Sequence, residues 1–210
     1  MIIVVSMTQV ITQPSSEAEA LQKMRDGILL VIIGWVFLGI GILMFVGGLI
    51  VSIITGFRIG FLPLIGAVVL VLVGGVIVLV GFYSRFIPGS SDLAKSDPEF
   101  STGATLIKVG YVWGLILLII GAILTLALIG VFIIIIGYVL LILGFVGMII
   151  LSFKLKDKYG NTLYLIAGIL FILGIIFAIL GVVAWILLYV ALGDTIRKLK
   201  TQQPTQAFLT

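Results

Sequence analysis

Few side chains in this sequence have the chemistry of a catalyst or a ligand. The chain has neither cysteine nor histidine, which removes thiolates, disulfides and imidazoles as nucleophiles, staples or metal ligands. Four long stretches, 28–57, 59–84, 109–153 and 159–193, contain no Asp, Glu, Lys or Arg. Proton relays and ion pathways usually need ionisable residues inside such apolar stretches, and these four stretches have none. We therefore predict a protein that is not an enzyme, with no catalytic, cofactor-binding or metal-binding residues and no cofactor.

The polar groups within these stretches are mainly hydroxyls. They are carried by Ser52, Thr55, Thr125, Tyr138 and Ser152. Hydroxyls in apolar helices usually bond to a carbonyl of their own helix, so we interpret them as packing residues, with substrate contact as the alternative. Arg58 separates two uncharged stretches, and we interpret it as an anchor at a hairpin tip, with an anion or lipid-headgroup contact as the alternative.

The composition places the chain in the membrane class. Apolar residues make up 62% of the sequence, charged residues 10%, and the mean hydropathy is +1.45. Soluble domains have roughly 45–50% apolar and about 25% charged residues. The net charge of +4 lies at the edges of the apolar runs, which indicates orientation in a bilayer and a lipid partner, not a nucleic-acid partner.

Run lengths divide the chain into predicted hairpins and polar segments. The 45 uncharged residues of 109–153 would form a single helix of about 67 Å, more than twice a hydrocarbon core, so they must fold back, with Gly130 as the best turn candidate. The predicted segments are a tail at 1–26 with a short amphipathic helix, a transmembrane hairpin at 27–83, a polar cytosolic loop at 84–108, a second hairpin at 109–153, a cytosolic loop at 154–162, a final transmembrane run at 163–193 and a cytosolic tail at 194–210.

The final run has 31 apolar residues, which is long for one span and short for two. A hairpin that turns near Gly181 places eleven basic residues on the inner side and only Arg58 on the outer side, as the preference of Lys and Arg for the cytoplasmic side favours. We therefore predict an all-α polytopic bundle of six helices in three hairpins, with both termini cytosolic, and five spans as the alternative.

The start of the first helix carries a capping signal. Ser16 and Glu19 have the spacing of a capping box, so we expect a helix to begin at Ser16 and to continue into the first span. Residues 1–13 show no helical pattern, and Met7 is an alternative first residue.

Small residues recur every seventh position in the apolar stretches. Gly34, Gly41 and Gly48 are one such series, and Gly130, Gly137 and Gly144 are another. Seven residues are nearly two helical turns, so each series lines one helix face and allows a second helix to approach closely. We expect these faces to pack within the chain, with contacts to a second copy or a partner as the alternative.

Basic residues also cluster after the last two apolar stretches. They are Lys154, Lys156 and Lys158, and Arg197, Lys198 and Lys200. We interpret them as determinants of topology, with binding of anionic lipid headgroups as the alternative. The Trp and Tyr residues lie mostly near the ends of the stretches, as in the aromatic belts of membrane proteins.

Four sequence blocks carry a resemblance to a known family: Glu17–Gly34, Ser101–Gly110, Lys158–Gly174 and Ala184–Leu199, the last of which begins with the distinctive AWILLYVALG. They resemble a family of uncharacterised archaeal membrane proteins of the Sulfolobales type, domain of unknown function family 973. Family members often have a proline in the middle of the last apolar run, where this chain has Ala178–Gly181. The resemblance implies a multi-pass protein of an archaeal plasma membrane and no established activity.

Two functions fit these observations. The first is a structural or accessory bundle that packs with itself or with a larger membrane complex, as the small-residue faces and the uncharged spans indicate. The alternative is a transporter or pore for a small neutral molecule or lipid, since weak internal similarity between 121–144 and 168–193 suggests the repeats from which transporters are often built.

Overall fold

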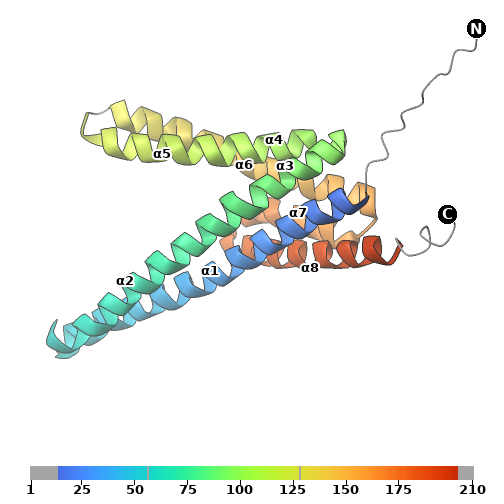
Figure 1. Cartoon of the computed structure of the whole chain (residues 1–210). Coiled ribbons are helices and arrows are strands. Elements are labelled where there is room, and N and C mark those ends of the chain that lie inside the picture. Colours follow the sequence, from blue (N-terminus) through green and yellow to red (C-terminus); the bar gives the residue numbers. More distant parts are fainter. Residues whose placement is uncertain (1–13, 56, 128, 203–210) are drawn as a thin grey trace, which may run out of the picture.

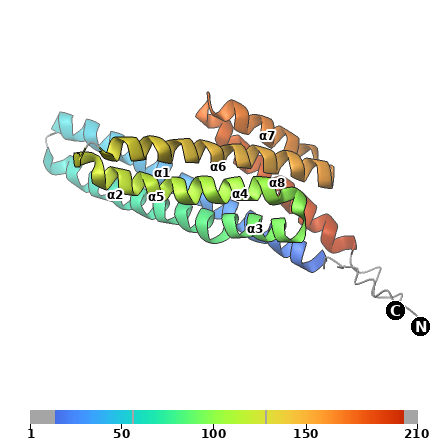
Figure 2. The same ribbon diagram turned by 90° about the horizontal axis from the view of Figure 1, so that it is seen from above.

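The computed structural model describes residues 14–55, 57–127 and 129–202, and the expectations for residues 1–13 lie outside this part of the chain. The described residues fold into helices that pair as three antiparallel hairpins (Figures 1 and 2). Within these described ranges, five helices are long and apolar enough to cross a membrane. The predicted all-α polytopic bundle of six helices in three hairpins is confirmed.

The first hairpin pairs two long helical segments. Its outgoing segment is α1 (Pro14–Thr55), which begins two residues before the expected cap at Ser16. Its return segment is continuous and comprises α2 (Phe57–Leu79), the π-helical η1 (Val80–Phe86) and α3 (Ile87–Ser96). The predicted polar helix at the start of the chain therefore continues into the first span without a break.

The second hairpin has the same plan. Its outgoing segment comprises η2 (Pro98–Phe100), α4 (Ser101–Lys108), the π-helical η3 (Val109–Trp113), α5 (Gly114–Ile123) and η4 (Leu124–Ala127). Its return helix is α6 (Ile129–Tyr159). Gly130, expected at the turn, lies in the first turn of α6, so the chain reverses slightly earlier than predicted.

The third hairpin is the shortest. It consists of α7 (Thr162–Gly174) and α8 (Ala178–Gln202), joined at residues 175–177, four residues before the turn expected near Gly181. Glycine lets the two helices approach closely at this turn, since a Cβ atom on Gly174 would lie only 2.9 Å from the backbone nitrogen of Gly181. With 13 residues, α7 is about 20 Å long, shorter than a hydrocarbon core of about 30 Å.

The segment 84–108, expected as a polar loop, is almost wholly helical. Pro88 is the second residue of α3, where a missing N–H costs little, and the π-helical η1 ends two residues before it. The chain turns at Asp97, whose backbone is extended, the conformation that a residue before proline prefers. The carboxylate of Asp97 accepts a hydrogen bond from the N–H of Glu99 at 2.9 Å. The polar residues therefore form a helical corner, not a flexible connection.

The corner between α6 and α7 is equally tight. Gly160 has φ +66°, the left-handed conformation in which glycine ends a helix, and its N–H bonds to the carbonyl of Lys156. The carboxamide of Asn161 then caps α7 by accepting from the N–H of Leu163 at 3.0 Å. Two residues are enough to reverse the chain.

The glycine series line the seams within hairpins, which confirms the expectation of packing within the chain. In the first hairpin, a Cβ atom on Gly34 would lie 2.7 Å from the carbonyl oxygen of Gly74. In the second, a Cβ atom on Gly110 would lie 2.2 Å from the backbone nitrogen of Gly144. Backbones this close leave no space for a side chain, so glycine is required at these positions.

The three hairpins meet at one end and separate toward the other. Figure 1 shows the first and second hairpins diverging, and near the joined end α7 contacts α6 and α8 contacts α1. We call the joined end the base, defined by buried residues such as Leu21, Phe86, Phe100, Leu155 and Leu192. We call residues 36–79 and 114–144 the arms. Among the described arm residues, Ala67 is the one buried hydrophobic side chain, and Ile53 and Ile123 are 83% and 71% exposed.

Candidate functional site

Aromatic side chains from all three hairpins meet in the centre of the base. Trp185 of α8 makes edge contacts with Phe86 of η1 at 5.3 Å and with Phe171 of α7 at 5.7 Å between ring centroids. Phe82 of η1 in turn contacts Tyr111 of η3 at 4.7 Å. Trp35 and Phe145 lie at the edge of this cluster, in contact with Trp185 and Phe171. Trp185 is buried, so it does not lie in the aromatic belt expected from the sequence.

The two π-helical segments face each other at this cluster. The hydroxyl of Tyr83 in η1 donates to the carbonyl of Tyr111 in η3 at 3.0 Å. The same carbonyl also accepts a hydrogen bond from the N–H of Gly114 in its own helix, so Tyr83 adds a second donor from a neighbouring helix. The wide turns therefore connect the first hairpin to the second.

A network of ion pairs closes the outer surface of the base around Lys158, at the end of α6. Its ammonium group contacts the carboxylate of Glu17 on α1 and lies 2.8 Å from that of Asp97 at the α3–η2 corner. The hydroxyl of Tyr159 also donates to Glu17. Because these side chains are only 18–27% exposed, water weakens their attraction less than on an open surface. The network fastens the second hairpin to both ends of the first.

The charge of Asp97 depends on this network. The hydrogen bond from Lys158, followed by the one from the N–H of Glu99, lowers the pKa of the Asp97 carboxyl below its ordinary value. Both donors stabilise the ionised form, and they outweigh the cost of partial burial. Asp97 therefore stays ionised to lower pH in the folded chain than in the unfolded one.

A second set of contacts joins α1 to α8. The guanidinium group of Arg25 lies 4.6 Å from the ring centre of Tyr189 and donates to its hydroxyl at 3.1 Å. The Nε atom of Arg25 is buried without a hydrogen-bond partner in the described part of the chain. Further into the third hairpin, the hydroxyls of Tyr164 and Thr195 lie 2.9 Å apart. Both contacts are at the base.

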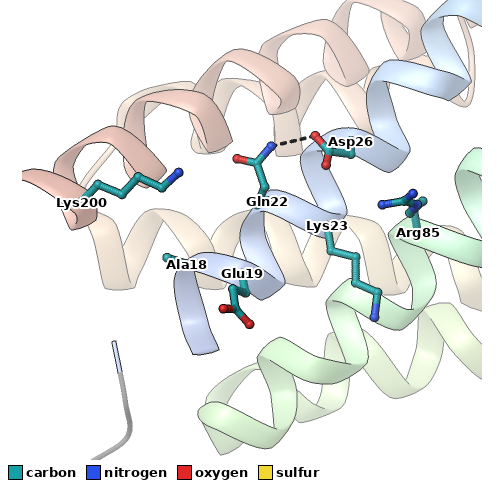
Figure 3. Close-up of a pocket in the computed structure, with 7 residues that line it drawn as sticks. All are labelled: Ala18, Glu19, Gln22, Lys23, Asp26, Arg85 and Lys200. Carbon is teal, nitrogen blue, oxygen red and sulfur yellow. Dashed lines mark hydrogen bonds between the residues drawn. The ribbon is translucent and has the colours of Figure 1, made fainter. Parts of the chain in front are cut away.

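A charged groove runs over α1 at the base, between η1 and α8 (Figure 3). Its volume is about 450 Å³. The lining residues are Ala18, Glu19, Gln22, Lys23 and Asp26 of α1, Arg85 of η1 and Lys200 of α8. Figure 3 shows Arg85 and Lys200 at opposite ends of the row, with the acidic residues and Gln22 between them. We regard this groove as the candidate functional site.

Several contacts fix the walls of the groove. Gln22 donates to the carboxylate of Asp26 at 2.7 Å. Lys23 forms an ion pair with Asp92 of α3 at 2.9 Å, and Asp92 also pairs with Lys95. Glu19, Arg85 and Lys200 have no ion pair within the described residues, and all three line the groove.

The hydroxyls singled out in the sequence do not converge on a site. Thr125 donates to the carbonyl of Gly121 at 2.8 Å, and Ser152 donates to that of Met148 at 2.9 Å, as the packing interpretation predicts. Ser52 is buried without a hydrogen-bond partner among the described residues, and Tyr138 is exposed. The side chains of Thr55 and Arg58 lie outside the described part of the chain.

The basic clusters do not form one surface either. Lys158 is engaged in the network with Glu17 and Asp97, and Lys156 pairs with Asp157 at 3.2 Å. Arg197 and Lys198 line a separate hollow of about 410 Å³ beside the α6–α7 corner. Lys200 lies in the groove over α1. The structure therefore separates the six residues that the sequence grouped together.

Sequence reasoning missed the groove itself. Its residues come from three elements that are distant in sequence, and each was read only as part of a polar segment. Arg85, which ends the uncharged stretch 59–84 three residues before Pro88, was the one available signal. Among the described residues, no group of three or more Asp or Glu side chains could hold a metal ion.

Comparisons with known proteins agree with the resemblance seen in the sequence. A family model described as "Protein of unknown function (DUF973)" matches residues 17–210. No curated protein and no solved structure matches the chain. The matched range covers every helix of the three hairpins except the first residues of α1. The chain belongs to the DUF973 family of proteins of unknown function.

Proposed function

We propose that the protein is a non-catalytic accessory bundle of the plasma membrane, which packs its arms against a second copy or against helices of a larger membrane complex. The observation that carries the proposal is the contrast between a closed base and open arms. At the base, side chains from three hairpins bury one another, whereas Ala67 is the one buried hydrophobic side chain among the described arm residues.

The arms offer surfaces on which another helix could pack closely. Gly39, Gly47 and Gly75 lie on the first arm, and a Cβ atom at each would meet no other atom within 4 Å. The same arm has a shallow hollow of about 290 Å³ lined only by apolar side chains: Ile42, Phe45, Ala67, Val68, Val71 and Leu72. Small residues and shallow hollows favour the close packing by which membrane helices associate.

Transport of a small neutral molecule or lipid is less well supported. A transport path needs polar groups that face a substrate, but Thr125 and Ser152 direct their hydroxyls to carbonyls of their own helices. The base is filled by aromatic and aliphatic side chains. These contacts favour packing over substrate contact in the spans.

We also propose that the base faces the cytoplasm. Eleven of the twelve Lys and Arg residues lie in or beside the helix ends that meet there, whereas Arg58 belongs to the turn of the first hairpin. This distribution agrees with the preference of basic residues for the cytoplasmic side. It would place the start of α1 and the end of α8 inside the cell.

The test is the mass of the complex after purification of the full chain in a mild detergent, measured by native mass spectrometry. We expect a dimer or a stoichiometric complex with another membrane protein. Gly39→Leu combined with Gly75→Leu should reduce the associated fraction several-fold and leave the melting temperature unchanged, because a Cβ atom at either position has open space. Leu43→Ile, an exposed conservative change on the same arm, should leave association unchanged. A monomer with a bound small molecule and no protein partner would contradict the proposal.

A further inference from the structure

The groove over α1 lies where the charged residues of the base give way to apolar helix surface. Arg25 and Asp26 are the last charged residues before the uncharged part of α1, and Arg85 is the first after the uncharged stretch of α2 and η1. The two boundaries lie at the same level, because a Cβ atom on Gly27 would be 3.0 Å from Cβ of Arg85. A groove at this level opens at the height of lipid headgroups.

The face of α1 that forms the groove floor continues as an exposed apolar strip. Gln22 and Asp26 are followed at helical spacing by Leu29, Ile33, Val36 and Ile40. These four side chains are between 38% and 55% exposed. A molecule that fits both parts has a polar head and a long apolar chain, as a membrane lipid has.

Charges of opposite sign alternate along the groove. Arg85 lies at the membrane end, Glu19 lies toward the start of α1, and Lys200 closes the outer end (Figure 3). Glu19 and Lys23 are one turn apart, about 6 Å along the axis. A purely anionic ligand would meet two carboxylates here, so the alternation favours a headgroup that carries charges of both signs.

The π-helical turn supports this role for Arg85. Arg85 is in the last turn of η1, where the wider π-helical turns change the direction of the side chains that follow. Ser84 donates its hydroxyl to the carbonyl of Val80 in the same segment. Short π-helical turns are frequent at functional sites, and this one presents a guanidinium group to the groove.

We propose that the groove binds a zwitterionic phospholipid headgroup that carries a phosphodiester and a primary amine. Arg85 donates paired hydrogen bonds to the phosphate, as its planar guanidinium favours. Glu19 accepts from the ammonium group farther from the membrane. The acyl chains lie along the strip from Leu29 to Ile40. This inference does not depend on the proposed assembly of the arms.

The test is the melting temperature of the full chain in detergent micelles with added lipid, because a ligand that binds the folded state raises it. We expect phosphatidylethanolamine to raise it more than phosphatidylglycerol or phosphatidylcholine. Arg85→Gln should remove at least half of the shift caused by phosphatidylethanolamine, and Arg85→Lys should retain part of it. Glu19→Gln should reduce the advantage of phosphatidylethanolamine over phosphatidylglycerol.

Lys108→Gln is the matched control, because it removes a positive charge that has no ion pair in the described chain and that lies outside the groove. It should leave the shift intact. Equal losses in Arg85→Gln and Lys108→Gln would overturn the proposal in favour of general attraction to lipid. A full shift caused by inorganic phosphate with ethanolamine, without lipid, would overturn it in favour of a site for soluble ions.

Discussion

The base and the arms are built from the same kinds of apolar residue but are held together in different ways. At the base, large aromatic and aliphatic side chains interdigitate among three hairpins, and ion pairs cover them. In the arms, glycine lets two backbones approach within each hairpin while large side chains point outward. In lipid, exposed apolar side chains carry little cost, so helices need close contacts or polar bonds to associate. The hairpins are therefore separate units that are joined at one end.

The strongest way to break the base is to remove Trp185. Trp185→Ala deletes the side chain that contacts η1, α1 and α7 together, so we expect a loss of about 3–5 kcal/mol in the free energy of unfolding. Thermal unfolding followed by circular dichroism measures it. Trp113→Ala removes a Trp that is 56% exposed and should cost less than half as much. Equal losses in the two variants would show that the aromatic cluster does not hold the hairpins together.

Replacing glycine by alanine in the arms should affect stability only on the helix face that packs against the other helix of the same hairpin. Gly74→Ala places a Cβ atom 2.8 Å from the carbonyl oxygen of Gly34, and we expect a loss of about 1–3 kcal/mol. The neighbouring Gly75→Ala meets no atom within 4 Å and should be neutral or slightly stabilising, since alanine favours the helix. The same unfolding assay compares the two. If Gly75→Ala were destabilised and Gly74→Ala were not, the backbones would not be in close contact at Gly34 and Gly74.

The ion-pair network should contribute less than the aromatic cluster. Lys158→Gln leaves Glu17 and Asp97 without their shared cation, and we expect a loss of about 1–2 kcal/mol. Lys156→Gln removes a more exposed pair with Asp157 and should cost below about 0.5 kcal/mol. Chemical denaturation in detergent can separate these values. If the two variants cost the same, the network does not fasten the hairpins.

Lowering the pH should affect stability less than the substitutions of Trp185, Gly74 and Lys158. The pKa of Asp97 is lowered in the folded state, so its contribution is complete above the unfolded pKa of about 4 and is lost as pH falls through the lower folded pKa. We expect the melting temperature of the native chain to decrease below about pH 4. In Lys158→Gln this decrease should be smaller, because the largest cause of the pKa shift is gone. An identical dependence of the melting temperature on pH in both proteins would show that Lys158 does not lower the pKa of Asp97.

The sequence predicts the hairpins well because each rule behind them is local. Uncharged runs too long for one span must fold back, and glycine at every seventh position marks a seam. Asp97-Pro98 and Gly160-Asn161 mark corners through their own backbone preferences. These features need no knowledge of other segments. The same reasoning placed the last turn only approximately, because residues 175–181 contain no polar residue to mark it.

The arrangement of the hairpins was not predictable in the same way. Trp185 resembles an interfacial residue in the sequence and becomes central only when η1 and α7 pack on α8. In the sequence, Lys158 is one of three lysines interpreted as determinants of topology. Only the fold brings it into contact with Glu17 and Asp97. Arg85 lies in the π-helical η1 and lines the groove, and no periodicity in the sequence reveals that π-helical segment. The missing information is tertiary contact.

The measurement that tests the account most directly is the distance between spin labels in the base and in the arms. The chain lacks cysteine, so label pairs can be introduced without background. We would place one pair on the arms, at Ile53 and Ile123, and one at the base, at Lys95 and Lys156, and measure both by double electron–electron resonance in lipid nanodiscs. The account predicts a short, narrow distribution at the base and a longer one between the arms. A short, narrow distribution for both pairs would show a closed bundle and contradict the separation of the arms.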